Sequence, residues 1–470
     1  MNHNTQNKPP LSSPAPEVIM MQWGLELGLR MRMMSFLAIT TILFAISFYP
    51  PVIFAEDPLV DKTSFIKAIV EDKHRVLLIT RPPNWGKTTN LRELENFLTP
   101  NVKSDCSYNT VLETYKARAM YNTVIDEHKG VIESYFGKYP TIFFSLKIKK
   151  AGTIEELYKQ IALRINKLYQ KYPYLSNSPN LNMEEIALFN KYATDYQILT
   201  KTEIIESLRF LEDILNKHFT KQTIILIDEY DYLVNKYYIA QFADHDLRLK
   251  ESPLLLEIYD LVGKMLAKAI KNNQSLHKAV VTGTTNIEKM GVFTDLENFR
   301  EDSVLNPYMS RYFGFTQNEL IGLLKKADIY YDDKVLADIK SWYGGYNIGG
   351  TDIYHPTSIV KMINSYKSRR DLVLTHVRYI SLSSDFTSPK RQKELLILLN
   401  GGSIDIETDP YVEFREIDSS SDSFYTLLVY QGFLAATNIR KNPNGTYRCS
   451  VKIPNKEYRE IFERARIVKK

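Results

Sequence analysis

The sequence predicts an α/β fold in which a parallel sheet is flanked by helices. Two apolar runs of strand character, Val76–Thr80 and Thr223–Asp228, are each followed at once by polar residues. Elsewhere, apolar residues recur every three and four positions, as at Ile154–Tyr169 and Ile204–His218, which indicates helices. Strands that alternate with such helices are typical of a parallel sheet. Two further strands are expected at Thr141–Leu146 and Ala279–Thr282.

The segment after the first strand has the composition of a phosphate-binding loop. It reads Arg81-Pro82-Pro83-Asn84-Trp85-Gly86-Lys87-Thr88-Thr89 and leads into a helix. Gly86 lets the backbone approach an anion, Lys87 adds a positive charge, and the Thr88 hydroxyl can hold Mg²⁺. The start of the helix adds N–H groups and the positive end of a dipole. Arg81 stands where the usual pattern has its first glycine. The tripeptide Gly86-Lys87-Thr88 alone therefore also fits an ordinary helix start.

The second strand supplies the complementary acidic groups. It ends in Asp228 and Glu229, and parallel sheets carry their chemistry at the carboxyl ends of the strands. Asp228 is expected to hold Mg²⁺ and Glu229 to polarise an attacking water. Many strands end in acids, but the pairing of Lys87-Thr88 with Asp228-Glu229, each directly after a strand, favours a nucleotide site. Thr282, at the end of the next strand, is expected to lie beside the phosphates.

Several further motifs give the chain a resemblance to a known family. In order, they are Asp61-Lys62-Thr63, the loop from Arg81 to Thr88, Ile227–Asp231, Val281–Gly283, Tyr312–Thr316, Trp342–Tyr346, Tyr354–Ser358 and Ile453–Glu457. Together they resemble the predicted AAA-ATPase-like family of bacterial proteins, from about residue 57 to residue 470. The resemblance implies a P-loop NTPase-type parallel sheet flanked by helices, a helical lid, a winged helix-like C-terminal module, and ATP and Mg²⁺ as cofactors.

The motifs and the resemblance together give a set of expected site residues. Lys87 and Glu229 are expected to be catalytic, and Thr88 and Asp228 to be metal ligands. The expected cofactor-binding residues are Arg81, Trp85, Gly86, Lys87, Thr88, Thr89, Thr282 and Asn286.

The chain departs from the family pattern at three positions that bear on catalysis. Family members usually have arginines where this chain has Pro83, Asn84 and Asn286. Arginine stabilisation of a transferring phosphoryl group is worth about 10³-fold or more in rate. We therefore expect an ATPase with slow hydrolysis that acts as a nucleotide-driven switch. The alternative is a non-hydrolysing scaffold that binds protein or nucleic acid and has a degenerate nucleotide site.

The expected organisation follows the motifs. It comprises a disordered leader at 1–34, a signal peptide or membrane anchor at 35–55, a nucleotide-binding domain at 57–315, a helical lid at 316–400 and the winged helix-like module at 401–470. The lid contains amphipathic helices at Gln317–Ala327 and Asp333–Trp342, and the last module a tight turn at Asn444-Gly445 before a strand at Thr446–Ile453. Relatives commonly continue into a PD-(D/E)XK nuclease-like domain, and the sequence printed here shows no such segment after the Ile453–Glu457 motif.

Two segments of the chain bear on its partners and its location. Residues 438–470 hold ten basic residues and three glutamates. This charge allows contact with nucleic acid or anionic lipid, but a solvated helix and wing fits it better, and an unknown protein partner is a further alternative. Arg30 and Arg32 precede an uncharged stretch, 35–55, which is either a signal peptide cut after Ala55 or an uncut anchor that contacts the membrane. Both predict export across the membrane, and secretion into a host cell is a hypothesis that would explain an exported ATPase.

Composition excludes several other classes of protein. Two cysteines, Cys106 and Cys449, form neither a zinc motif nor a disulfide scaffold, and the eight histidines lack ligand spacing. The net charge of +5 over 470 residues is mild. The length allows two or three domains with a large core.

Overall fold

The computed structural model describes residues 60–102, 123–149, 151–241, 252–287, 290–369, 389–411, 417 and 420–467. The leader at 1–34, the signal peptide or anchor at 35–55, and Cys106 lie outside the described residues, so the expectations about them stay predictions. Within the described part of the chain, no helix combines the length and the apolar character that a membrane crossing requires.

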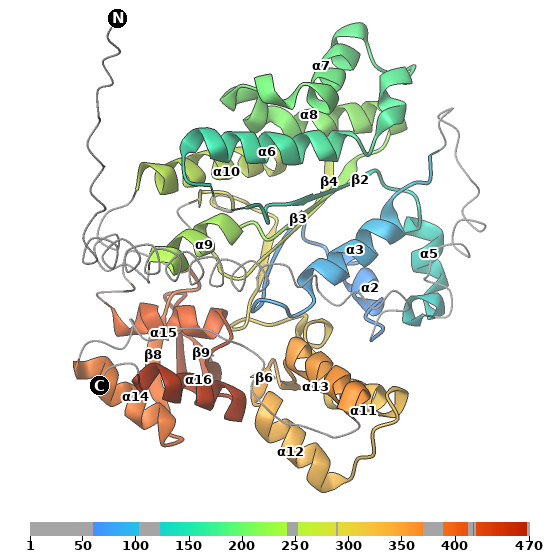
Figure 1. Ribbon diagram of the computed structural model, residues 1–470. Coiled ribbons are helices and arrows are strands. Elements are labelled where there is room, and N and C mark those ends of the chain that lie inside the picture. Colours follow the sequence, from blue (N-terminus) through green and yellow to red (C-terminus); the bar gives the residue numbers. More distant parts are fainter. Residues whose placement is uncertain are drawn as a thin grey trace, which may run out of the picture. The chain divides into compact units, whose positions relative to one another are not determined.

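A five-stranded sheet lies at the centre of the fold, in the order β2-β3-β4-β1-β5 (Figure 1). Every neighbouring pair of strands in it is parallel, which confirms the predicted α/β class. The strands are β1 Val76–Thr80, β2 Thr141–Ser145, β3 Thr223–Asp228, β4 Leu276–Gly283 and β5 Phe299–Asp302. All residues of β1 and β3 are buried, as expected for interior strands of a sheet covered on both faces.

Helices cover the sheet on both faces. Helix α3 contacts β2 and β3, while α8 contacts β3 and α10 contacts β4. Figure 1 shows α6, α7, α8 and α10 together in one helical layer, on the other side of the sheet from α2 and α3. The helices of this half are α2 Ser64–Val70, α3 Lys87–Leu98, α5 Lys129–Tyr135, α6 Ile154–Tyr169, α7 Met183–Thr194, α8 Lys201–Phe219, α9 Tyr232–Gln241 and α10 Pro253–Ile270, with short 3-10 turns at Val124–Glu127, Pro173–Asn177 and Tyr196–Ile198.

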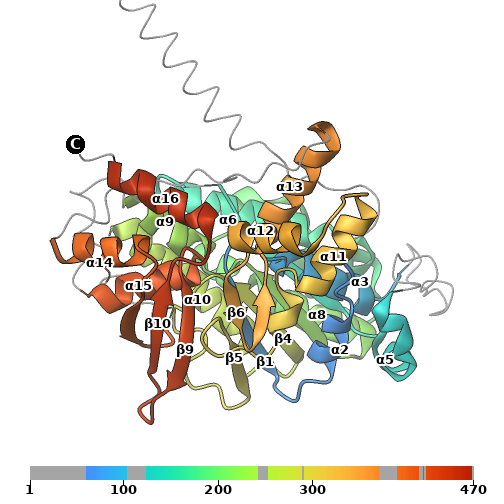
Figure 2. The same ribbon diagram turned by 90° about the horizontal axis from the view of Figure 1, so that it is seen from below.

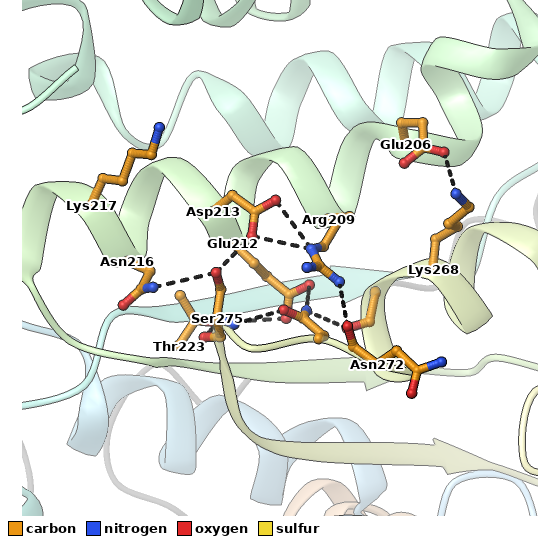
Figure 3. A network of polar contacts seen from close by, with 12 residues as sticks. Glu206, Arg209, Glu212, Asp213, Asn216, Lys217, Thr223, Lys268, Asn272 and Ser275 are labelled. Atoms are coloured by element: carbon orange, nitrogen blue, oxygen red, sulfur yellow. Dashed lines mark hydrogen bonds and ion pairs between the residues drawn. The ribbon is translucent and has the colours of Figure 1, made fainter. Parts of the chain in front are cut away.

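A polar network fixes the helical layer to the amino end of the sheet (Figure 3). The fully buried Glu212 of α8 accepts a hydrogen bond from Asn273 Nδ2 at 2.8 Å. Thr223, the first residue of β3, donates through its hydroxyl to Ser275 O at 3.0 Å, and Ser275 Oγ donates to Asp213 at 2.6 Å. Burial, followed by the nearby Asp213 charge, raises the pKa of Glu212 well above its usual value. The network therefore contains a buried carboxyl group whose surroundings favour the protonated form.

The segment after β5 forms a helical group with a small hairpin. Figure 2 shows α11, α12 and α13 next to one another, beside β6. Its elements are a 3-10 turn at Ser310–Tyr312, α11 Gln317–Lys326, α12 Asp333–Tyr343, β6 Tyr346–Ile348, β7 Thr351–Ile353 and α13 Pro356–Arg369. Thr316 and Glu319 form a capping box at the start of α11. The two expected lid helices are thus present, within one residue of their predicted ends.

The last described segment contains a second, antiparallel sheet in the order β8-β10-β9. Its elements are α14 Pro389–Leu399, β8 Ile404–Thr408, α15 Ser421–Tyr430, β9 Ala435–Lys441, β10 Tyr447–Lys452 and α16 Lys456–Ile467. The winged helix-like assignment stays a prediction. On the exposed side of this sheet, Arg448 of β10 lies opposite Arg440 of β9 and opposite Glu407 of β8. This side of the sheet therefore carries both positive and negative charge and is not uniformly basic.

Candidate functional site

Two residues with left-handed backbone shape the loop between β1 and α3. Gly86 occupies the N-cap of α3 with φ of 89°, a left-handed conformation that glycine adopts without steric cost. A Cβ atom added there would meet nothing within 4 Å, so Gly86 is required by its backbone angle rather than by crowding. Asn84 is also left-handed, with φ of 64°. The loop therefore turns sharply just before the positive end of α3.

Lys87 lies inside the loop that precedes it. Its side chain is 3 % exposed, and Nζ donates to Arg81 O at 2.9 Å and to Pro82 O at 3.1 Å. Burial lowers the pKa of Lys87, whereas the nearby carboxylates of Glu229, Asp231 and Asp228 favour its charged form. The ammonium group is thus held by two backbone carbonyls, next to three acidic side chains.

Asp228 is the point at which the expected residues meet. Thr88 Oγ1 donates to Asp228 Oδ1 at 3.0 Å, and Thr282 Oγ1 reaches the same oxygen at 3.2 Å. Ser145 Oγ donates to Asp228 Oδ2 at 3.1 Å. Burial and then the Glu229 charge raise the pKa of Asp228, while the Thr88 and Ser145 hydroxyl groups act in the opposite direction. The first turn of α3 and the two strands on either side of β3 therefore each bring a hydroxyl group to one carboxylate.

Ser145 was missed by the sequence reasoning. It ends β2 directly opposite Asp228 in the parallel register. The signal was available in the sequence, since Ser145 is the first polar residue after the apolar run Ile142–Phe144, at the same end of the sheet as Asp228.

Glu229 follows Asp228 in an uncommon backbone conformation. Its φ is 55°, which costs energy for a residue with a side chain and is often found at functional sites. The side chain is half-buried and contributes to the electrostatic surroundings of both Lys87 and Asp228. Thr89 is exposed on the first turn of α3.

The side chains of Arg81 and Trp85 are used inside the protein. Arg81 is fully buried, and its guanidinium donates to Asp302 Oδ1 at 2.8 Å and to Asp302 O at 3.0 Å. The Trp85 indole, 1 % exposed, packs edge-on against Tyr346 with ring centroids 5.1 Å apart. Both residues were expected to bind the cofactor. In the structure their side chains contact Asp302 and Tyr346, and the expected role at the cofactor stays a prediction.

Asn286 lies apart from the contacts around Asp228. It is buried and faces Glu301 of β5, whose pKa is raised to about 7 by burial. It also lines a cavity of about 480 Å³ together with Phe293, Phe299 and Tyr411. The expected contact of Asn286 with a nucleotide stays a prediction.

The loop contacts the segments that follow the central sheet. Gly314 N donates to Trp85 O at 3.2 Å, and Asn90 Nδ2 of α3 donates to Tyr312 O at 2.9 Å. A Cβ on Gly432 would lie 2.9 Å from Pro82 Cβ, so this glycine allows the β9 side of the second sheet to touch the loop. The loop is therefore packed directly against both later segments of the chain.

Comparisons with known proteins identify one matching family. Residues 46–293 match the family described as Predicted AAA-ATPase. Among solved structures, the chain is similar to a Signal Transduction ATPase with Numerous Domains protein with a tetratricopeptide repeat sensor from Pyrococcus horikoshii, at 13 % identity and a TM-score of 0.28. That similarity covers 90 % of this chain and 45 % of the other, so the chain spans less than half of the length of that protein. The comparison with curated proteins gives no match.

Proposed function

Because the chain belongs to the Predicted AAA-ATPase family, we propose that it binds ATP with Mg²⁺, hydrolyses it slowly and uses the bound nucleotide as a switch. The observation that carries the proposal is the hydrogen bond from Thr88 Oγ1 to Asp228 Oδ1 at 3.0 Å, next to the buried Lys87. A hydroxyl and an ammonium group from consecutive residues of α3, together with a carboxylate from β3, form a set suited to a metal-bound phosphate.

The oxygen groups around Asp228 fit a magnesium ion. Mg²⁺ prefers hard oxygen ligands and in nucleotide sites is held by one or two protein groups together with phosphates. Thr88 and Asp228 would hold it, with Ser145 and Thr282 orienting the carboxylate through their hydroxyl groups. When bound, the ion would neutralise charge on the phosphates.

The residues of the chain have separable tasks in this proposal. Lys87 binds the terminal phosphates after its ammonium group leaves the carbonyls of Arg81 and Pro82. The amide groups at the start of α3 add further anion contacts. Glu229 accepts a hydrogen bond from the water that attacks the γ-phosphorus, and so orients it. Slow turnover follows from the absence of arginines at Pro83 and Asn84.

The switch proposal is supported by the packing of the loop. Nucleotide binding draws Lys87 away from two carbonyls of a loop that contacts Tyr346 through Trp85 and Gly432 through Pro82. A change in the loop conformation would therefore alter its contacts with both later segments of the chain. Export through 35–55 is proposed separately, on the uncharged stretch alone. Recovery of the protein from the cytosol only, with these residues intact, would reject it.

Calorimetric titration of the purified protein with ATP and Mg²⁺ tests the proposal. Lys87→Ala should abolish binding, and Glu229→Gln should retain ATP without hydrolysing it. Lys340→Ala, which removes an exposed ion pair with Asp352, serves as the control and should behave as wild type. If neither site variant differs from this control, the non-hydrolysing scaffold is the better description.

A further inference from the structure

Two consecutive side chains join the carboxyl ends of β3 and β4. Asp231 Oδ2 accepts hydrogen bonds from Thr284 N at 2.9 Å, Thr285 N at 2.6 Å and Thr285 Oγ1 at 2.8 Å. Asn235 Nδ2 donates to the same oxygen at 2.6 Å. Asp231 and Thr285 are both completely buried. The turn that leaves β4 is thus fixed to the segment that leaves β3.

Tyr230 adds a second connection to the same turn. Its backbone N–H donates to Thr282 O at 3.0 Å. Its hydroxyl donates to Thr285 O at 2.9 Å and accepts from Ile287 N at 2.9 Å. The Tyr230 side chain is 1 % exposed. We refer to Tyr230, Asp231 and the turn 284–287 as the Tyr230–Asp231 clamp.

The clamp explains why glycine occupies position 283. A Cβ atom there would lie 2.6 Å from the Tyr230 ring and 2.7 Å from Asp231 Oδ1. Contacts below 3.0 Å force a shift of the neighbouring atoms. Gly283 therefore permits the close approach on which the clamp depends, and the motifs Ile227–Asp231 and Val281–Gly283 form one structural unit.

The clamp lies immediately beside the strained residue Glu229. A left-handed backbone at a non-glycine residue persists only where its surroundings hold it. Tyr230 and Asp231 hold the chain directly after Glu229, through six hydrogen bonds to Thr282, Thr284, Thr285 and Ile287. We propose that Tyr230 and Asp231 are positioning residues that fix the Glu229 carboxylate and the turn after Thr282 relative to each other at the phosphates. This inference rests on the proposed nucleotide site.

Asp231 has a second carboxylate oxygen that the clamp does not use. Its other oxygen, Oδ1, has no hydrogen-bond partner, although the side chain is completely buried. An asparagine would hold the turn through the same oxygen position without a buried charge. The carboxylate adds to the field that favours the charged form of Lys87.

Two tyrosine variants test the inference. Tyr230→Phe removes the clamp hydroxyl, and Tyr169→Phe removes an equally buried hydroxyl that donates to Ser207 O at 2.6 Å in the helical layer. We expect Tyr230→Phe to lower kcat for ATP about 10- to 100-fold, as a displaced reacting group does, with KM nearly unchanged. Tyr169→Phe should keep both constants. Equal kcat values in the two variants would overturn the inference.

Two aspartate variants separate hydrogen bonding from charge. Asp231→Asn keeps an oxygen for Thr284 and Thr285, so its turnover should lie between those of the wild type and Asp231→Ala. Amide hydrogen exchange at Thr284, Thr285 and Ile287, measured without nucleotide, should be faster in Asp231→Ala and Tyr230→Phe than in Tyr169→Phe. Unchanged exchange in both clamp variants would also overturn the inference.

The outcomes distinguish this inference from the proposed function. A wild-type protein that binds no ATP rejects the nucleotide site and the inference with it. A wild type that hydrolyses ATP, with clamp variants that match Tyr169→Phe, rejects the inference alone. If the wild type binds ATP without turnover, the variants are compared by the ratio of their ATP affinity to their ADP affinity and not by kcat. Tyr230→Phe should lower that ratio, and an unchanged ratio rejects the inference.

Discussion

Arg81 and Asp302 form a buried ion pair that links the loop between β1 and α3 to the edge strand of the central sheet. Arg81 Nη2 lies 2.8 Å from Asp302 Oδ1, and the two side chains are 0 % and 2 % exposed. Asp302 also accepts hydrogen bonds from Tyr308 N at 2.9 Å and Met309 N at 3.1 Å, in the segment that leads to α11. One carboxylate therefore holds both the loop and the start of the next segment.

Removal of Asp302 should be strongly destabilising. Asp302→Ala leaves the Arg81 charge buried without its partner, which typically costs about 3–5 kcal/mol of unfolding free energy. Lys340→Ala breaks an exposed pair with a similar distance of 2.8 Å and should cost below about 1 kcal/mol. Urea denaturation of the two variants measures the difference. The double variant Arg81→Met with Asp302→Leu should recover much of the loss, and equal destabilisation by the two single variants would contradict the assignment.

Ser145 should affect nucleotide affinity only through the metal. Because its hydroxyl donates to Asp228, Ser145→Ala should weaken binding of magnesium-ATP about 10- to 100-fold, as loss of an outer-shell partner does. ATP binding in the presence of a chelator should be unchanged. Calorimetry with and without Mg²⁺ makes the comparison, and Ser176→Ala, which removes an exposed hydroxyl bonded to Asn190, is the matched control. An equal loss in both conditions would show that Ser145 acts on the fold.

Glu212 should make stability depend on pH. The pKa of Glu212 is raised in the folded state. The contribution of this carboxyl group to the free energy of unfolding is therefore fully present below the unfolded pKa of about 4.3, and it is lost as the pH rises toward the folded pKa. Glu212→Gln mimics the protonated form, because its oxygen can accept from Asn273 and its amide can donate to Thr223. The variant should become more stable than wild type as pH increases from about 5 to 8, by at most about 1.4 kcal/mol per pH unit.

Denaturation midpoints over this pH range provide the measurement for Glu212. Glu206→Gln is the control, since Glu206 is exposed on the same helix and pairs with Lys268 at 2.8 Å. Its stability relative to wild type should vary little with pH. A pH-independent difference for Glu212→Gln would mean that the carboxyl group is ionised in the folded protein.

Gly345 and Gly350 should respond differently to alanine. Both have positive φ, 87° and 79°, so each substitution carries a backbone cost of about 1–2 kcal/mol. At Gly345 the new Cβ would also lie 1.8 Å from Pro454 O, whereas at Gly350 it would meet nothing within 4 Å. Gly345→Ala should therefore be the more destabilising by urea denaturation. Equal losses would indicate that the Pro454 segment moves away freely.

The sequence predicted the parts of the fold that depend on local pattern. The ends of β1 and β3 agree with the predicted ranges, because a continuous apolar run bounded by polar residues defines where a buried strand begins and ends. Strand β4 begins at Leu276, earlier than expected, since Lys278 interrupts the apolar pattern. In the structure Lys278 Nζ donates to Ile69 O at 3.0 Å and to His74 O at 3.1 Å, so a lysine is accommodated inside the strand.

Features that depend on distant partners could not be predicted. Strand β5 reads Phe-Arg-Glu-Asp and has one apolar residue, so nothing in its pattern indicates a strand. It forms because it pairs with β1 and because Arg81 supplies a buried partner for Asp302. The contact of Trp85 with Tyr346 joins residues more than 250 positions apart, so the local pattern around Trp85 could not indicate it.

The edge-on contact of Trp85 with Tyr346 places an intrinsic optical reporter in the loop itself. Indole emission depends on nearby rings and solvent, and Trp85 is fully enclosed between Tyr346 and His355. The chain has three tryptophans, so replacement of Trp23 and Trp342 by phenylalanine would leave one source of signal. Its spectrum would then follow any rearrangement of the loop in real time, in unlabelled protein.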